Sequence, residues 1–408
     1  PFWSTLSDAG KRVAIIDLPK TYPTKGLNGI QVVDWANHDA DTLEGFLTWP
    51  TNLRSELDRR YGSDPFNRHA FGSRGPTNFP AFVDGLCKNV EHKTRLFLDL
   101  LNQEPWDLLF AAWDDAHWAG HFGWRLHDPT HPFHDPDLVA EVGDPLARVL
   151  ITLDRSIGEI IDHVGPETTI MLLSSHGMGP AYRTSLMIEP ILRRLEATPE
   201  GRNKIYKKLR LVWDNLPGQI HRPLTQLKDF IREGLLEKDR ARRRSFPLPC
   251  NNDGGCIRLN VIGRDPEGLI QPGAEYDAHC QWLIDELSAV VDADTGEPII
   301  RRVVKIRDHM DGEHLNILPD LAIQWNVSTP THCITSPRIG EIETEIPRWR
   351  TGEHLPQGFL LSTAAGVVPG EINSIVRAED LAPTVGRLLD VPFHDIDGSP
   401  VEEMLPRH

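Results

Sequence analysis

Histidine residues recur in three short segments of the chain, and each segment also contains glycine. The segments are residues 114–121 (DDAHWAGH), 174–180 (SSHGMGP) and 351–358 (TGEHLPQG). Imidazole nitrogen binds zinc and similar ions well, and a glycine-containing turn exposes it. His117 and His121 are four residues apart, so on a helix they share one face and can chelate one ion. The pattern predicts a metal-centred hydrolase, with surface or core-capping histidines as the alternative; the candidate ligands are His117, His121, His176 and His354.

Two carboxylates precede the first pair of histidines. Asp114 and Asp115 directly follow an apolar run at residues 107–113. A carboxylate beside imidazoles serves either as a metal ligand or as the hydrogen-bond acceptor that fixes an imidazole tautomer. Asp115 is therefore a candidate for either role.

The first two histidine segments follow apolar runs that predict buried strands. These runs are residues 107–113 and 168–173, and a third run occupies residues 13–18. Apolar residues recur at three- and four-residue steps over residues 146–164, which predicts an amphipathic helix that Gly165-Pro166 ends. Strand and helix thus alternate as in a parallel sheet with helices on both faces. Ligands of such sheets bind beyond the carboxyl ends of the strands, where these histidines fall.

Residues 194–250 differ from the rest because they are polar and lack strand patterns. We expect a small helical insertion there, within one domain that spans residues 1–408. Its basic cluster is interpreted as a solvated face rather than as an anion site; the cluster is Arg240, Arg242, Arg243 and Arg244. Elsewhere the patterns predict strands at 256–262, 299–305, 321–325 and 359–362, and helices near 90–101, 275–291 and 378–389.

Composition excludes several classes of protein. The 408 residues carry a formal net charge of -16, which repels a polyanion, so nucleic acid is not expected as a partner. No apolar run approaches the ~18 residues that a membrane-spanning helix needs, so no membrane partner is expected. With 39% apolar residues the chain can bury a sizeable core.

The cysteines and the first residues bear on the compartment. The chain has five cysteines, an odd number, dispersed and without a CxxC pair, which favours reduced thiols in a cytoplasm. The sequence begins Pro1-Phe2-Trp3, without the pattern of a signal peptide, and reaches an apolar run by residue 13. We therefore expect a fragment whose upstream part is missing, and that part could carry a signal peptide.

Together these segments resemble the type I phosphodiesterase/nucleotide pyrophosphatase branch of the alkaline phosphatase superfamily. The most specific similarities are Ser175-His176-Gly177-Met178, where the family has Asp-His-Gly-Met or Asp-His-Gly-Phe, and residues 352–358, which match the family's Gly-x-His-x-Pro-x-Gly. The resemblance implies an α/β fold, an alkaline-phosphatase-like three-layer sandwich with a mainly parallel central sheet. The resemblance extends over residues 106–136, 168–180, 257–276, 319–326, 351–358 and 380–400.

The resemblance also implies metal ligands. Family members bind two metal ions, and a Thr or Ser near the N-terminus attacks phosphorus. The family's first ion is held by an Asp, a His four residues later and the late His, which correspond to His117, His121 and His354. His117 thus replaces the Asp, and three imidazoles still suit zinc.

The second ion of the family takes an Asp-His pair, which corresponds to Ser175 and His176. A serine hydroxyl is a weaker ligand than a carboxylate. The upstream Asp and the nucleophile have no counterpart, because residues 1–18 already resemble the family's segment after the nucleophile helix. The resemblance therefore leaves two readings, a one-metal variant or an altered second site completed by residues upstream of residue 1. In either case we expect residues 1–408 alone to be inactive towards chromogenic phosphodiesters.

Two further regions are weaker candidates for substrate contacts. The loop at residues 127–136 is dense in His, Asp and Pro, so His127 and His131 either contact substrate or metal or belong to an ordinary polar loop. Arg258 lies in a segment resembling the family's Ile-Arg-x-Asn and suits a bidentate contact with an oxyanion, although a structural salt bridge is as plausible.

The sequence therefore predicts a metal-dependent hydrolase of phosphodiester or pyrophosphate bonds in a small-molecule phosphate ester. The expected cofactor is a divalent metal, one or two ions, with zinc favoured and manganese as the alternative. The alternatives are a phosphomutase or sulfatase on the same scaffold, or a non-catalytic metal-binding relative. The nucleophile, the substrate and the oligomeric state are not specified by the sequence.

Overall fold

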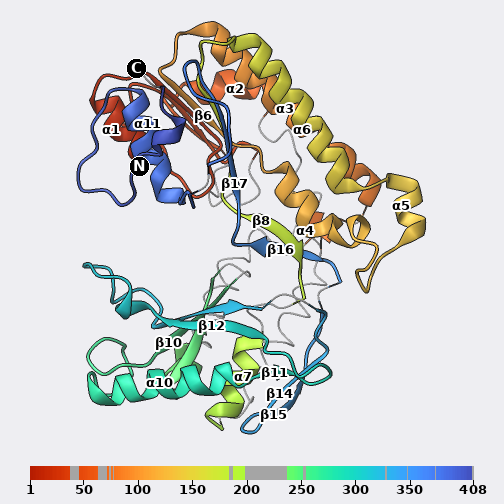
Figure 1. Ribbon diagram of the computed structural model, residues 1–408, viewed down its shortest axis with the longest axis vertical. Coiled ribbons are helices and arrows are strands. Elements are labelled where there is room, and N and C mark those ends of the chain that lie inside the picture. The colour runs from red at the N-terminus through yellow and green to blue at the C-terminus, as the bar shows by residue number, and fades with distance from the viewer. Residues whose placement is uncertain are drawn as a thin grey trace. The chain divides into compact units, whose positions relative to one another are not determined.

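The described chain divides into two compact units. Unit 1 comprises Pro1–Gly179 and Leu355–His408, and unit 2 comprises Pro180–His354 (Figure 1). The computed structural model describes residues 1–36, 46–62, 71–72, 75–76, 78–182, 187–197, 237–250, 254–326, 329–346, 348–372 and 374–406.

A four-stranded sheet with the order β3-β2-β1-β6 forms the centre of unit 1. β1 (Val13–Ile16) pairs in parallel with β2 (Gly29–Val33) on one side and with β6 (Leu108–Ala111) on the other, whereas β3 (Leu47–Trp49) is antiparallel to β2. All four residues of β1 are buried, as expected of a continuous apolar run in a sheet covered on both faces. The strands predicted at residues 13–18 and 107–113 are thus confirmed, with ends that are one or two residues shorter.

The strand predicted at residues 168–173 does not join this sheet in the described chain. It is β7 (Ile170–Ser174), and it pairs with antiparallel β17 (Phe359–Thr363) over five residues, from Ile170 opposite Thr363 to Ser174 opposite Phe359. The expectation that it runs parallel to β6 in one sheet is therefore wrong for the described strands. β7 and β17 are both short runs of five residues. The local sequence therefore does not show that β7 pairs with β17 rather than with β6.

Helices α3 (Phe79–Gln103) and α6 (Pro145–Val164) pack side by side in unit 1, and α4 (Asp115–His127) packs against both (Figure 1). Asp144 accepts a hydrogen bond from the Ala147 N–H and so caps α6, which begins with proline at its first position. The predicted helices at 90–101 and 146–164 are confirmed, and α3 extends further towards the N-terminus. The remaining helices of unit 1 are α1 (Phe2–Asp8), α2 (Leu53–Tyr61), α5 (Pro136–Val142) and α11 (Leu381–Leu388).

Unit 2 contains a second four-stranded sheet, in the order β12-β13-β10-β9. All its ladders are antiparallel, so the strands predicted at 256–262, 299–305 and 321–325 exist but do not extend a parallel sheet. A core of buried aliphatic residues lies around this sheet and includes Leu283 and Leu287 of α10. The bounds are β9 (Ser245–Leu248), β10 (Gly254–Leu259), β12 (Ile300–Lys305), β13 (Leu321–Trp325), α7 (Ile188–Leu195), α10 (Ala274–Ser288), β11 (Val291–Asp292), β14 (Cys333–Ser336) and β15 (Gly340–Glu343).

The chain passes from one unit to the other within two paired strands, β8 (Gly177–Pro180) and β16 (Gly352–Leu355). The predicted helical insertion at 194–250 lies mostly outside the described residues, of which it includes 194–197 and 237–250. The single-domain organisation stays a prediction. The small elements are β4 (Phe71–Gly72), β5 (Gly75–Pro76), η3 (Ile306–Asp308), η4 (Ala378–Asp380) and η5 (Glu402–Met404).

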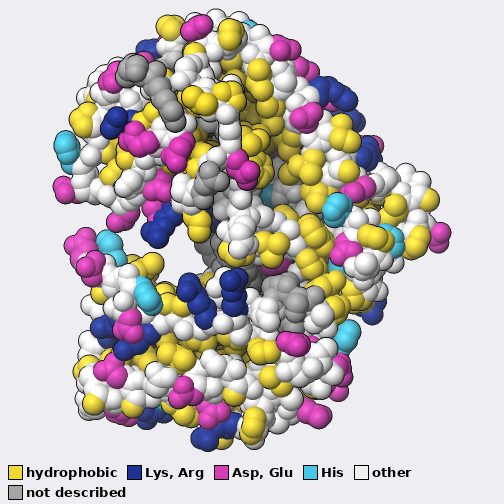
Figure 2. Space-filling view, in the orientation of Figure 1, with side chains coloured by type: hydrophobic (Ala, Val, Ile, Leu, Met, Phe, Trp, Pro, Cys, Tyr) yellow, Lys and Arg dark blue, Asp and Glu magenta, His cyan; other side chains and the backbone are white. Residues whose placement is uncertain are grey.

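The described chain is an α/β protein with mixed sheets, in agreement with the predicted class. No disulfide joins any of the five cysteines, all of which are described. Among the described helices, none combines the length and the apolar character that crossing a membrane requires. On the face drawn in Figure 2, acidic and basic side chains are interspersed among hydrophobic ones.

Candidate metal centre

Helix α4 brings two of the predicted ligands together. It begins at Asp115, after a three-residue connection from β6, and it places His117 and His121 one turn apart. Their Nε2 atoms are 3.0 Å apart and their ring planes are nearly perpendicular. His121 is buried, with 4% of its surface exposed. The pair therefore presents two imidazole nitrogens at a separation that one metal ion can bridge.

His354 of β16 completes a group of three imidazoles. The candidate ligand atoms of His117, His121 and His354 all lie within 4.8 Å of one another. Two nitrogens that bind one tetrahedral zinc ion at its usual bond length are about 3.3 Å apart. The 3.0 Å between the Nε2 atoms of His117 and His121 is close to that value. The donor set also fits, because neutral imidazole is a common zinc ligand.

The residue before His354 is a buried carboxylate. Glu353 is 4% exposed, and Arg350 Nη2 donates to its Oε1 at 3.1 Å. The same oxygen accepts the His354 backbone N–H at 3.1 Å. These bonds neutralise Glu353 locally and fix the backbone that carries the His354 ring.

His176 lies in the turn between β7 and β8. Its ring centroid is 5.4 Å from that of His117, so the structure brings this fourth predicted residue to the same group. Ser174 Oγ donates to the His176 carbonyl oxygen at 2.6 Å, which holds the turn at the end of the strand. Ser175 is exposed.

Two glycines of the predicted motifs allow close approaches around this turn. A Cβ atom at Gly358 would lie 1.8 Å from the Ser174 carbonyl oxygen, so only glycine lets the chain after β16 pass the end of β7. A Cβ atom at Gly120 would lie 2.7 Å from Met178 Cε. Met178 Cε is the end of a flexible side chain, so this contact shows that α4 packs against Met178 but does not by itself require glycine.

Asp115 is fully buried at the first position of α4. Its Oδ1 accepts a hydrogen bond from Asn89 Nδ2 at 2.8 Å. Burial raises the pKa of Asp115 to about 7, the charge of Asp114 adds to this, and Lys93 and Asn89 oppose it. Asp115 lies two residues before His117 on α4, and the partner of its Oδ1 is Asn89.

The two loop histidines are tied to their own loop and its neighbours. His127 Nδ1 lies 2.7 Å from Asp144 Oδ2, the residue that caps α6. His131 is buried, and its Nδ1 accepts the Phe133 N–H at 3.1 Å. These contacts give both residues a structural role, and a contact with substrate stays a prediction.

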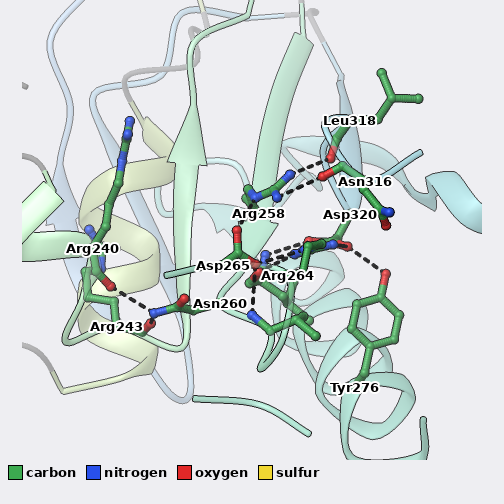
Figure 3. A network of polar contacts seen from close by, with 12 residues as sticks. Arg240, Arg243, Arg258, Asn260, Arg264, Asp265, Tyr276, Asn316, Leu318 and Asp320 are labelled. Carbon is green, nitrogen blue, oxygen red and sulfur yellow. Dashed lines mark hydrogen bonds and ion pairs between the residues drawn. The ribbon is translucent and has the colours of Figure 1, made fainter. Parts of the chain in front are cut away.

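Arg258 belongs to a polar network inside unit 2 (Figure 3). Its Nε donates to Asp265 at 2.7 Å, and its two terminal nitrogens donate to the carbonyl oxygens of Leu318 and Asn316 at 3.1 and 2.9 Å. Every nitrogen of the guanidinium therefore already has a protein acceptor. A role for Arg258 in substrate binding stays a prediction.

The basic cluster of the predicted insertion is only partly solvated. Arg242 is exposed, but Arg243 is buried, with Nη1 at 2.8 Å from Glu189 and 3.5 Å from Asp239. For Arg243 the expectation of a solvated face is wrong. The reason is that two acids, one on α7 and one four residues earlier, supply the charge that a buried guanidinium requires.

Three residues near the centre were not anticipated: Asp17, Asn89 and Lys93. Asp17 follows β1 directly and has a positive φ of 55°, which is uncommon for a residue other than glycine. Asn89 and Lys93 occupy the buried stripe of α3, at positions that continue the spacing of Leu86 and Leu96. A signal was present, because polar residues on the apolar stripe of a helix require buried partners.

Comparisons with known proteins agree with this description. The family model "Type I phosphodiesterase / nucleotide pyrophosphatase" matches residues 1–240, which include all the predicted ligands except His354. No curated protein sequence matches the chain. Human ectonucleotide pyrophosphatase/phosphodiesterase 5 is a similar solved structure, with 12% sequence identity and a TM-score of 0.37 over 99% of this chain and 74% of that one. At this level the similarity carries no detail. The match to the family model extends over more than half of the sequence, and the chain therefore belongs to the type I phosphodiesterase/nucleotide pyrophosphatase family.

Proposed function

We propose that the chain is a metal-dependent hydrolase of phosphodiester or pyrophosphate bonds in a small molecule. His117, His121 and His354 hold one divalent ion, which is zinc. His176 and Ser175 lie on the side where a second ion binds. The observation that carries the proposal is the group of three imidazoles from distant parts of the sequence, with all candidate ligand atoms within 4.8 Å.

The chemistry of the family requires negative charge on phosphoryl oxygens to be stabilised during the reaction, and a bound divalent ion supplies this as a Lewis acid. The histidines of the chain hold and orient this ion. His121 is buried, so it offers its nitrogen in a place of low dielectric constant, where electrostatic interactions are strong. Ser175, which directly precedes His176, is exposed to solvent. The cysteines, none of which forms a disulfide, support a cytoplasmic location.

The proposal is tested by the zinc content of purified protein. His354→Ala removes one of three ligands, and we expect it to lower the bound zinc from stoichiometric to a small fraction. His163→Ala is the matched control, because His163 is exposed on α6 and is not one of the three grouped histidines. Equal zinc content in the wild type and in His354→Ala would contradict the three-histidine site.

The second ion is tested separately with Ser175→Asp. A carboxylate adds a charged oxygen ligand, so we expect tighter binding of a second zinc or manganese ion in a calorimetric titration. No gain would mean that the region around Ser175 does not complete a second site. In a form extended upstream of residue 1, stoichiometric zinc without turnover of bis(4-nitrophenyl) phosphate or of pyrophosphate esters would favour the non-catalytic relative instead, because residues 1–408 alone are expected to be inactive.

A further inference from the structure

A buried lysine lies beside the first turn of the helix that carries two of the histidines. We propose that Lys93 is a positioning residue for the metal centre, which it serves by fixing the junction between β6 and α4. The proposal rests on the proposed function, because it presupposes that His117 and His121 bind metal. Lys93 acts through Asp17, Ala112 and Asp114, with which its ammonium is in contact.

Lys93 joins three segments at the carboxyl ends of two parallel strands. Its Nζ is 3.2 Å from Asp17 Oδ2, which directly follows β1, and 3.2 Å from Asp114 Oδ1, which precedes α4. It also donates to the Ala112 carbonyl oxygen at 3.1 Å, immediately after β6. Ile16 and Ala111 are register partners, so these acceptors follow adjacent strand ends.

Asn89 extends the same connection to the next residue of α4. It lies one turn before Lys93 on α3, and it donates to Asp115 while Lys93 binds Asp114. Two neighbouring side chains of α3 thus hold two consecutive residues at the start of α4. His117 follows two residues later, so the orientation of its ring depends on how this turn is held.

Asp17 is itself fixed, which makes it a rigid anchor for the lysine. Its two carboxylate oxygens accept the backbone N–H groups of Trp35 and Ala36, both at 2.8 Å. Asp17 is 1% exposed and Lys93 is 0% exposed. A buried ion pair of this kind contributes little net stability over an apolar replacement, so a role in orienting its neighbours is a better account of it.

Loss of the contacts between Lys93 and the junction of β6 and α4 weakens metal binding without removing a metal ligand. Partners that orient metal ligands affect affinity by roughly 10- to 100-fold when they are lost. For Lys93→Met we therefore expect at least about a tenfold weaker zinc affinity. Asn89→Ala removes only the bond to Asp115, and we expect a smaller change in the same direction.

The experiment compares these variants with Leu100→Ala, all in the full chain. Leu100 lies on the same helix in an apolar cluster with Ile16 and Leu57, so its truncation lowers stability without touching α4. Zinc affinity is measured by competition with a chromophoric chelator. The visible absorption of the Co²⁺-loaded protein reports ligand geometry independently of activity, and denaturant unfolding shows how closely the variants match in stability.

The expected result is weaker zinc binding and an altered Co²⁺ spectrum for Lys93→Met and Asn89→Ala, with both unchanged for Leu100→Ala. Should Lys93→Met fail to fold, Asn89→Ala decides alone. If the wild type binds metal and Asn89→Ala behaves like Leu100→Ala, the positioning role is overturned while the proposed function stands. If the wild type binds neither zinc nor Co²⁺, the metal centre itself is wrong and both proposals fall.

Discussion

Each unit buries a cluster of charged residues, but the two clusters differ in their balance. In unit 2, two guanidiniums (Arg258, Arg264) face two carboxylates (Asp265, Asp320), and Tyr276 donates to Asp320 at 2.8 Å (Figure 3). In unit 1, the ammonium of Lys93 faces three carboxylates, which are those of Asp17, Asp114 and Asp115.

The pKa values of the carboxyls show the consequence. Burial alone would raise the pKa of Asp265, but hydrogen bonds from the Val261 N–H, Arg258 and Arg264 outweigh it and hold that pKa below its usual range. Burial raises the pKa of Asp115 to about 7, because Lys93 and Asn89 do not compensate for burial and for the charge of Asp114.

The cluster in unit 2 is therefore a structural network, whereas the cluster in unit 1 is electrostatically unfavourable. Where every buried charge is matched, the cluster stabilises the sheet on which it lies. Where carboxylates outnumber cations, the protein tolerates unfavourable electrostatics beside the histidines, and such imbalance is typical of functional sites. The predictions below test this difference.

In the charged cluster of unit 2, the most destabilising substitution is expected at Asp320. This carboxylate is 1% exposed, and it accepts two bonds from Arg264, one from the Leu259 N–H and one from Tyr276. Asp320→Ala leaves a buried guanidinium uncompensated, and we expect a loss of about 3–5 kcal/mol in the free energy of unfolding. Urea denaturation measures it; a loss below about 1 kcal/mol would show that the network is dispensable.

Metal bound by the histidines, beside the Lys93 cluster of unit 1, should stabilise the folded protein. A ligand that binds only the folded state at 100 times its Kd adds about 2.7 kcal/mol. We therefore expect a chelator to lower the unfolding midpoint and zinc to restore it. In His354→Ala the zinc-dependent shift should nearly vanish. An equal shift in both proteins would place the stabilising metal elsewhere.

A third prediction concerns pH and the buried His131, which lies in neither cluster. Burial lowers its pKa, and nearby Arg125 and His134 act in the same direction, whereas Asp128 opposes them. The folded state then binds fewer protons than the unfolded state just below pH 6.5, so His131 contributes stability above that pH and loses it as pH falls.

The slope attributable to this one proton is at most about 1.4 kcal/mol per pH unit. We expect the difference in unfolding free energy between the wild type and His131→Gln to shrink as the pH falls from 7.5 to 5. Equilibrium denaturation at several pH values measures it. A difference that is constant with pH would contradict the assignment to His131.

The smallest effect should come from an exposed ion pair that joins α6 to α3, the helix that carries Lys93. Arg148 Nη2 lies 2.8 Å from Asp84 Oδ1, with 40% and 56% of the side chains exposed. Water screens such a pair, so Asp84→Asn should change the free energy of unfolding by less than about 1 kcal/mol. Thermal unfolding of this variant beside Lys93→Met compares an exposed and a buried charge on one element.

The sequence anticipated the secondary structure near the centre better than the pairing of strands. Periodicity identified the run that became α6, and a spacing of four placed His117 and His121 on one helical face, because both signals depend on local geometry. The pairing of β7 with β17 joins residues about 190 positions apart, and no local signal specifies such a contact.

The supporting residues of the site were missed for a related reason. The histidines stood out by residue type, whereas Asn89 and Lys93 resembled ordinary polar positions of a helix. Their importance depends on which side of α3 is buried, and Asp17 matters because β1 and β6 are neighbours. These are properties of tertiary packing, which a single sequence does not display.

The paired strands β8 and β16 have a consequence for how the sequence can be rearranged. The two ends of unit 2 are adjacent, since the Ala181 N–H donates to the Thr351 carbonyl oxygen at 2.9 Å. A segment whose ends meet behaves as an insertion, and such segments tolerate shortening or replacement well. Residues 182–350 could thus be exchanged for a short loop while His354 keeps its strand.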